Sequence, residues 1–176
     1  TGVTGSCHQL FLEESTAGSG TARSVLVDCG LFQGKDQDDD AFSQLQVRFD
    51  LGGVCALLVT HVHLDHVGRL PYLLAAGFRG PIVCTRASAQ LLPLVLEDAL
   101  KVGFTRDAAL IQRFLGRIGQ QLLAVDYSQW LTLIDDRRTR LRVRFEPAGH
   151  ILGSAYIRCS LMDRLQARRC RSMSEQ

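Results

Sequence analysis

Three histidines and one aspartate lie together in a single short stretch of this sequence. Residues 60–68 contain them with the spacing H-x-H-x-D-H, as His61, His63, Asp65 and His66. If the chain is still extended there, alternate side chains share a face, so His61 and His63 point to the same side. Neutral imidazole and carboxylate groups are ligands of Zn²⁺ and comparable divalent ions. The spacing therefore predicts a metal site that two ions could share, whereas a lone histidine would be interpreted as an ordinary polar residue at a strand end.

Three stretches of the sequence resemble a known family. Residues 61–68 resemble the signature motif of the metallo-β-lactamase superfamily, and residues 4–8 and 148–155 resemble its β-CASP branch, which processes RNA, in particular the single-chain bacterial members. The resemblance covers residues 1–160, and its Ala-Gly-His-Ile-Leu-Gly stretch at 148–153 is absent from the lactamases and glyoxalases of the same fold. It implies an α/β protein with the αββα sandwich of the superfamily, incomplete here at roughly the first half of the fold. It also implies a hydrolase that cleaves phosphodiester bonds in RNA.

The resemblance implies a role for each residue of the cluster. His61, His63 and His150 match the ligands of the first metal ion, which is zinc in the family. Asp65 and His66 match two ligands of the second ion and are the expected catalytic residues. Two neighbouring ions lower the pKa of a shared water, and Asp65 would accept or hold its proton. Without the matching neighbours, His150 would be interpreted as a turn or core residue.

A further carboxylate, Asp28, ends the apolar stretch before Gly30. A buried carboxylate needs a compensating partner, so its position at the end of a buried strand is unusual. The resemblance implies that Asp28 orients a ligand histidine and does not bind metal itself. The alternative is an aspartate that initiates a turn before Gly30.

The sequence departs from the family after Ala155. The family continues with a Gly-Asp motif whose aspartate bridges both metals, then an inserted RNA-clamping domain and a final histidine ligand. Here the chain continues with Met162, Asp163 and Arg164, and Asp163 has no glycine beside it. We therefore expect this chain alone to bind about one metal ion tightly and to hydrolyse RNA weakly or not at all.

Two other functions stay open. The chain could be a metallo-hydrolase of small esters or thioesters, as in other branches of the superfamily, or a truncated relative without catalytic activity. The sequence does not decide between RNA and DNA, between endonuclease and exonuclease cleavage, or among oligomeric states.

The elements that must position the cluster alternate between short apolar runs and longer helical stretches, which predicts a mixed α/β architecture. The expected strands are 9–13 and 24–28, paired as a hairpin, then 54–60, 81–84, 141–145 and 155–160. The expected helices are 69–76, 88–101 with Ser88 as its N-cap, and 106–118 capped by Thr105. The histidine cluster would thus follow the carboxyl end of a buried strand.

Composition places the chain among globular proteins. Its 176 residues are 46% hydrophobic and 22% charged, which fits one domain. The apolar runs 54–59 and 91–96 are far shorter than the roughly 20 residues that span a bilayer. The start shows no secretion signal, so we expect a cytoplasmic protein. Six widely spaced cysteines without a C-x-x-C pair are interpreted as buried free thiols.

Positive charge gathers near the end of the chain. The formal charge is +2, and residues 161–176 carry four arginines against two acids, so this tail holds the whole surplus. We expect a disordered basic tail there, and a solvated face for the arginine series at 137, 138, 140, 142 and 144. No aromatic residue interrupts that series, so the sequence does not predict a surface that stacks single-stranded nucleic acid.

Overall fold

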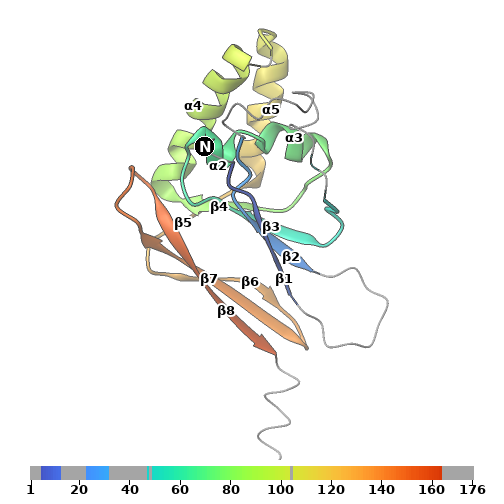
Figure 1. Cartoon of the computed structure of the whole chain (residues 1–176), viewed down its shortest axis with the longest axis vertical. Helices are drawn as coiled ribbons and strands as arrows, with labels where there is room; N and C mark the ends of the chain where they lie inside the picture. The colour runs from blue at the N-terminus through green and yellow to red at the C-terminus, as the bar shows by residue number, and fades with distance from the viewer. Residues whose placement is uncertain (1–4, 13–22, 32–46, 48, 104, 164–176) are drawn as a thin grey trace, which may run out of the picture.

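The computed structural model describes residues 5–12, 23–31, 47, 49–103 and 105–163, which form two sheets and a layer of helices (Figure 1). The first sheet has the strand order β1-β2-β3-β4-β5. β1 runs antiparallel to β2, and the remaining neighbours are parallel. Its strands are β1 (His8–Phe11), β2 (Ser24–Val27), β3 (Val54–Leu58), β4 (Ile82–Thr85) and β5 (Leu122–Val125).

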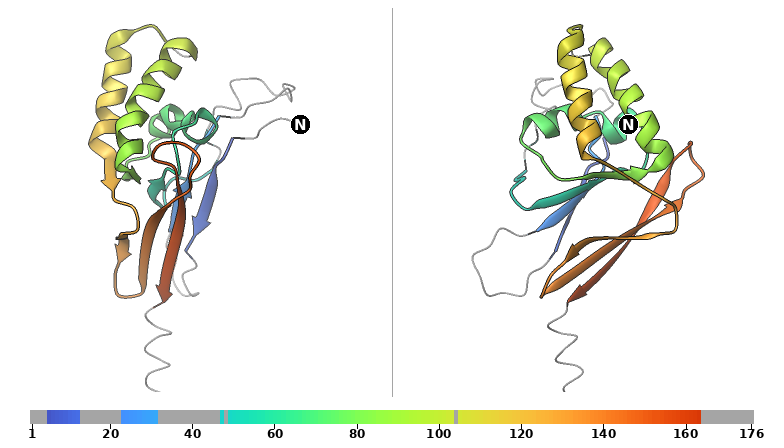
Figure 2. Two further views of the ribbon diagram at one scale, coloured as in Figure 1. Left: turned by 90° about the vertical axis from the view of Figure 1, so that its left-hand side faces the viewer. Right: turned by 180° about the vertical axis from the view of Figure 1, so that it is seen from behind.

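The second sheet is an antiparallel meander of three strands in the order β6-β7-β8. These are β6 (Trp130–Asp135), β7 (Thr139–Pro147) and β8 (Ala155–Asp163). The helices are α2 (Leu64–Val67), α3 (Leu70–Ala75), α4 (Arg86–Gly103) and α5 (Ala108–Gln121). The helices cover one face of the first sheet and the second sheet packs on its other face, as the turned views show (Figure 2).

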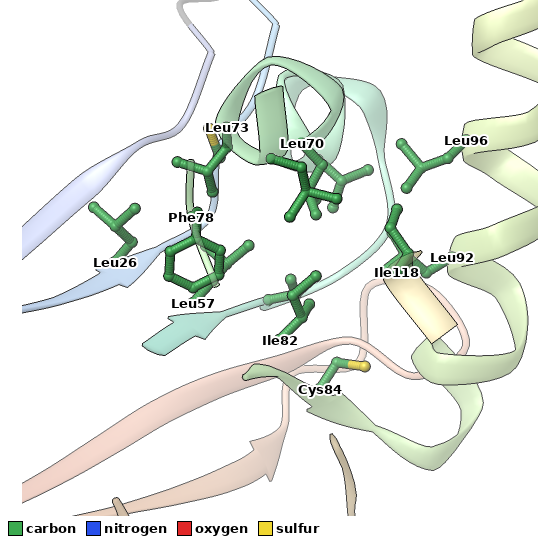
Figure 3. Packing of buried hydrophobic residues seen from close by; sticks show 14 of the residues in the cluster. Leu26, Leu57, Leu70, Leu73, Phe78, Ile82, Cys84, Leu92, Leu96 and Ile118 are labelled. Carbon is green, nitrogen blue, oxygen red and sulfur yellow. The ribbon is translucent and has the colours of Figure 1, made fainter. Parts of the chain in front are cut away.

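The alternation of side chains along β3 explains these layers. Leu57 and Val59 contact the core beneath the helices, whereas Ala56 and Leu58 contact the core between the sheets. A strand with both faces buried reads as a continuous apolar run, which is why the sequence of 54–60 predicts it. Figure 3 shows the helix-side core, in which Leu57 and Ile82 of the sheet lie below Leu70 and Leu73 of α3.

The described layers are helices, first sheet and second sheet, in that order, which correspond to the first three layers of the predicted αββα sandwich. Among the residues that the structure describes, no helix lies on the outer face of the second sheet. No described helix is long and apolar enough to cross a bilayer.

The two long helices begin differently from the sequence prediction. α4 starts at Arg86, so the predicted cap Ser88 is inside its first turn, and the Thr85 hydroxyl accepts the Ser88 amide at 3.3 Å instead. α5 is capped by Asp107, whose carboxylate accepts the amides of Ala109 and Leu110, and not by Thr105. Asp is as good an N-cap as Ser or Thr, so residue type alone did not decide between neighbouring positions.

The sequence analysis missed two strands and ended another strand too early. β5 follows α5 without any intervening residue, so the sequence offers no turn signal between them. β6 was also missed. β8 runs to Asp163, past the predicted domain boundary at 160 and into the expected tail. The predicted hairpin of β1 and β2 is confirmed, while its turn at 15–21 and the tail from 164 lie outside the described residues.

Candidate metal centre

The first sheet brings the predicted carboxylate and the histidine cluster to one edge. β2 and β3 are parallel neighbours, so their carboxyl ends lie side by side. Asp28 follows β2 directly, and His61 comes three residues after the end of β3. The carboxyl edge of parallel strands is the usual place for a functional site in such sheets.

Three imidazoles from distant parts of the chain converge at this edge. One ring nitrogen from each of His61, His63 and His150 lies within 4.8 Å of the others. His63 Nδ1 and His150 Nε2 are 3.3 Å apart. Two ligands of a tetrahedral zinc ion with bonds of about 2.05 Å are separated by about 3.3 Å. The separation of this pair already fits zinc, and the third nitrogen needs only a small side-chain adjustment.

The protonation state of His61 suits a metal ligand. Burial and, to a smaller extent, the neighbouring His66, His63 and His150 rings together lower the pKa of His61 to about 4. At neutral pH this imidazole is therefore uncharged and keeps a lone pair for a metal ion. An imidazole nitrogen is one of the donors that Zn²⁺ prefers, and this site offers three of them.

A hydrogen-bonded chain orients two of the histidines. The Oδ2 atom of Asp28 is 2.8 Å from His66 Nδ1 and accepts the Thr60 hydroxyl proton at 2.8 Å. The Thr60 hydroxyl oxygen is in turn 3.0 Å from His61 Nδ1. Because Asp28 and the Thr60 oxygen act as acceptors, both histidines carry their proton on Nδ1 and leave Nε2 free. Asp28 therefore contacts His66 directly and His61 through Thr60, and its role in orienting metal ligands stays a prediction.

Thr60 is a member of this chain that the sequence reasoning did not identify. Its amide also donates to Asp28 Oδ1 at 2.8 Å, so one residue holds both carboxylate oxygens. The carboxylate is buried, with 2% of Asp28 exposed, and its φ is 60°. That left-handed conformation is one that aspartate tolerates better than most residues.

Asp65 and His66 form a second, smaller group beside the first. Both lie in α2, and Asp65 Oδ2 is 3.7 Å from His66 Nε2. Among the described residues, these two are in no group of three ligand atoms that gather at one point, and Asp28 contacts the other ring nitrogen of His66. Asp163 pairs with Thr139 at the end of β8 remote from His150, about 26 Å along the strand from Ala155. It cannot complete the second group.

The loop that carries His150 is fastened to the first sheet and to the start of α4. The Gly153 carbonyl accepts the hydroxyl protons of Thr85 at 2.7 Å and Ser88 at 3.0 Å. The Ala155 amide donates to the Thr60 carbonyl at 2.9 Å. Gly153 has a φ of +85°, and a Cβ there would lie 2.6 Å from Ser88 Oγ. Ser88, predicted as a helix cap, thus positions the His150 loop.

The backbone around α2 is held by the strand ends below it. The Ser6 amide donates to the Asp65 carbonyl and the Cys29 amide to the His66 carbonyl, each at 2.7 Å. A Cβ on Gly30 would lie 1.5 Å from the Asp65 carbonyl oxygen. Only glycine allows the loop after Asp28 to approach the ligand helix this closely.

The arginines of β7 lie away from this centre and are not simply solvated. Leu141, Val143 and Phe145 face the first sheet, so the alternating arginines occupy the other face. The guanidinium groups of Arg142 and Arg144 lie over the Trp130 ring, 5.0 and 5.1 Å from its centroid. No aromatic residue interrupts the series in the sequence, but the fold brings Trp130 to it from the neighbouring strand β6.

Comparisons with known proteins show which family this chain resembles. The model of the family described as "Metallo-beta-lactamase superfamily" matches residues 9–154. A ribonuclease from Thermus thermophilus is 42% identical over 161 residues, which are 88% of this chain and 32% of that protein. A transcription termination factor from Methanothermobacter thermautotrophicus is 33% identical over 134 residues, 74% of this chain and 20% of that protein.

Among solved structures, a flavo di-iron protein from Thermotoga maritima has 16% sequence identity and a TM-score of 0.44, and the alignment covers 79% of this chain and 29% of that one. The chain thus spans a third or less of the length of the curated relatives named above. The family match includes β1, the histidine cluster and the His150 loop. The chain belongs to the metallo-β-lactamase superfamily.

Proposed function

We propose that this chain is the metal-binding part of a zinc-dependent hydrolase that cleaves phosphodiester bonds in RNA. The observation that carries the proposal is the convergence of His61, His63 and His150 on one point beside a carboxylate-bearing helix. The name of the Thermus relative, a ribonuclease, supports RNA as the substrate. The β-CASP type expected from residues 148–155 agrees with that name.

A zinc ion held by the three histidines would supply a Lewis acid that polarises a phosphoryl oxygen and acidifies water near neutral pH. The chain's own residues would do the rest. Asp28 and Thr60 would hold the proton of His61 on Nδ1, which would leave Nε2 free to bind the ion. Asp65, which is half-buried and adjacent to His66, would take the proton of an attacking water.

The second group of ligands limits the activity that we propose. Asp65 and His66 provide two donors, and zinc sites that hold metal firmly use at least three protein ligands. We therefore expect about one tightly held zinc ion per molecule and slow hydrolysis of RNA. Complete catalysis by the family type would need donors beyond this pair.

Metal analysis of the purified chain tests the first half of the proposal. Elemental analysis after gel filtration should give about one zinc per molecule for the wild type and much less for His150→Ala. His150 is exposed, so its removal should leave the fold intact. The control is His8→Ala, an exposed histidine on β1 outside the site. Two firmly bound ions would contradict the one-metal proposal, and equal zinc in wild type and His150→Ala would contradict the ligand set.

Substrate assays test the second half. End-labelled single-stranded RNA, DNA of the same sequence and a thioester substrate should be offered to the zinc-loaded chain at equal concentrations. Slow cleavage of RNA that is lost in His150→Ala and kept in His8→Ala would support a nuclease. Thioester turnover without RNA cleavage would favour the small-substrate hydrolase. Zinc binding without any turnover would favour a non-catalytic binding role.

A further inference from the structure

The outer face of the second sheet combines arginines with aromatic rings. Residues directly opposite each other in antiparallel strands share a face, so the strand register shows which side chains join the arginines of β7 there. The face consists of Trp130, Thr132 and Asp135 of β6, Arg140, Arg142, Arg144 and Glu146 of β7, and Tyr156, Arg158, Ser160 and Met162 of β8. In the part of the chain that the structure describes, no helix covers this face (Figure 2).

One row across the three strands places two arginines and the tryptophan side by side. Arg144 of β7 lies opposite Arg158 of β8 on one side and opposite Trp130 of β6 on the other. Like charges directly opposite each other in a sheet repel. The Arg144 guanidinium has the Glu146 carboxylate as a partner at 2.5 Å, whereas no carboxylate of the described residues pairs with Arg158. An anion bound between the two guanidinium groups would remove this repulsion.

Two exposed rings flank the arginines. Trp130 is 39% exposed and Tyr156 is 54% exposed. The guanidinium groups of Arg142 and Arg144 are held over the Trp130 ring by cation–π attraction. Unpaired bases stack both on aromatic rings and on arginine guanidinium planes. The face therefore offers stacking surfaces as well as positive charge.

The charge of the face is complementary to a phosphate backbone. The face carries four arginines against two acids, a surplus of two positive charges, from Arg140, Arg142, Arg144 and Arg158 against Asp135 and Glu146. Arginine binds phosphate oxygens through two parallel N–H donors. An acidic peptide would match the charge but would leave the exposed rings without a partner. A single-stranded polynucleotide matches both the charge and the rings.

We propose that the outer face of the second sheet binds single-stranded RNA, with phosphates on Arg142, Arg144 and Arg158 and bases stacked on Tyr156 and beside Trp130. The choice of RNA rests on the proposed function. The face itself is a second contact surface that contains none of the metal ligands.

The face begins close to the metal centre. Arg158 is about 10 Å along β8 from Ala155. The Ala155 amide donates to the carbonyl of Thr60, the residue before the first ligand histidine. One RNA strand held on this face is thus within reach of the metal centre, and the face would retain the substrate there.

The fluorescence of Trp130 tests the proposal directly, because the chain has a single tryptophan. Oligouridine added to the full chain should quench this fluorescence until the face is saturated, and binding should weaken as salt is added. The same quenching should be seen with and without a zinc chelator, because the face includes no metal ligand. An oligouridine that does not bind, or that binds without changing the fluorescence of Trp130, would overturn the proposal.

Three variants separate charge from stacking, with binding followed by a fluorescent label on the oligouridine. Arg158→Ala should lower the slope of log K against log salt by about 0.7, the value for one phosphate contact on a single strand. Tyr156→Ala should weaken binding at least about fivefold through lost stacking. Arg113→Ala, an exposed arginine on α5, is the matched control and should change neither quantity. Equal results for Arg158→Ala and Arg113→Ala would overturn the proposal, and so would polyglutamate that binds as tightly as oligouridine, since it would favour an acidic protein partner.

Binding and cleavage fail separately in these experiments. RNA binding on this face without hydrolysis by the zinc-loaded chain would support the proposed face and contradict the proposed nuclease. Hydrolysis of RNA with no quenching of Trp130 would support the nuclease and overturn the face.

Discussion

Replacing Asp28 with asparagine tests whether this carboxylate sets the orientation of the ligand rings. Asn keeps the size of the side chain and tolerates the left-handed φ of 60°, so the backbone should not be disturbed. One carboxylate oxygen becomes an NH₂ group. At the Oδ1 position it would face the donor amide of Thr60, which is now 2.8 Å away. At the Oδ2 position it would face His66 Nδ1 and the Thr60 hydroxyl, each also at 2.8 Å.

Each orientation has a definite cost. With NH₂ at Oδ1, a buried donor loses its acceptor, which costs about 1 to 3 kcal/mol of unfolding free energy. With NH₂ at Oδ2, the Thr60 hydroxyl loses its acceptor and donates to His61 Nδ1 instead, which moves the proton of that ring to Nε2, where it would block metal binding. Loss of such a supporting contact typically weakens metal affinity by about 10- to 100-fold. This corresponds to about 1.4 to 2.7 kcal/mol of binding free energy.

The assay separates stability from affinity. Urea unfolding of the metal-free proteins gives the change in unfolding free energy, and competition with a chromogenic chelator gives the zinc dissociation constant. Ser6→Ala is the control, because the Ser6 hydroxyl donates to the same Oδ2 atom over a long 3.4 Å and should matter little. If Asp28→Asn matches both the wild type and Ser6→Ala in zinc affinity and in unfolding free energy, the reasoning about the Asp28 carboxylate is refuted.

Three further results are expected. Gly153→Ala should weaken zinc binding, because its Cβ would lie 2.6 Å from Ser88 Oγ and displace the His150 loop. Gly119→Ala, which has open space around its Cβ, should bind zinc as the wild type does. Equal zinc affinities of the two variants in the chelator competition assay would contradict this prediction. Leu57→Ala, fully buried between layers, should lower the unfolding free energy by about 2 to 5 kcal/mol in urea, and Leu94→Ala, which is 62% exposed, should change it by less than about 0.5 kcal/mol. Asp136 should titrate near pH 2 when its carboxyl group is followed by NMR, because hydrogen bonds from the Thr139 and Arg138 amides and from Arg23 lower its pKa. Its contribution to stability is present above about pH 4 and is lost as the pH falls through 2. A midpoint near pH 4 would show that these hydrogen bonds do not persist in solution.

The ligand cluster could be predicted from sequence because its members are close in the chain. Spacing alone identifies a candidate metal cluster in His61, His63, Asp65 and His66, and the buried strand before them is a continuous apolar run. Asp28 and His150 needed the family resemblance, because nothing local distinguishes them. The structure brings all of these residues to one edge of the sheet, and their roles as ligands stay predictions.

The supporting residues could not be predicted, because their roles depend on contacts between distant segments. Thr85 and Ser88 are ordinary helix-start residues in the sequence, yet both donate to the carbonyl of Gly153, more than 60 residues away. Thr60 is similar: its position beside His61 is obvious, but its partner Asp28 is 32 residues earlier. Trp130 shows the same limit on the second sheet, since its neighbours Arg142 and Arg144 come from another strand.

The contact between His63 and His150 also fixes an order of assembly, because the two residues are 87 positions apart. Bringing the ends of a flexible loop of that length together costs on the order of 4 kcal/mol in entropy. All five strands of the first sheet lie before residue 126, so that sheet can form while the polypeptide is still being synthesised. The third imidazole arrives only when β7 and β8 have paired. The group of three imidazoles can therefore close only after all strands of the first sheet have been synthesised, so a metal ion bound there would join the β7–β8 hairpin to a sheet that has already formed.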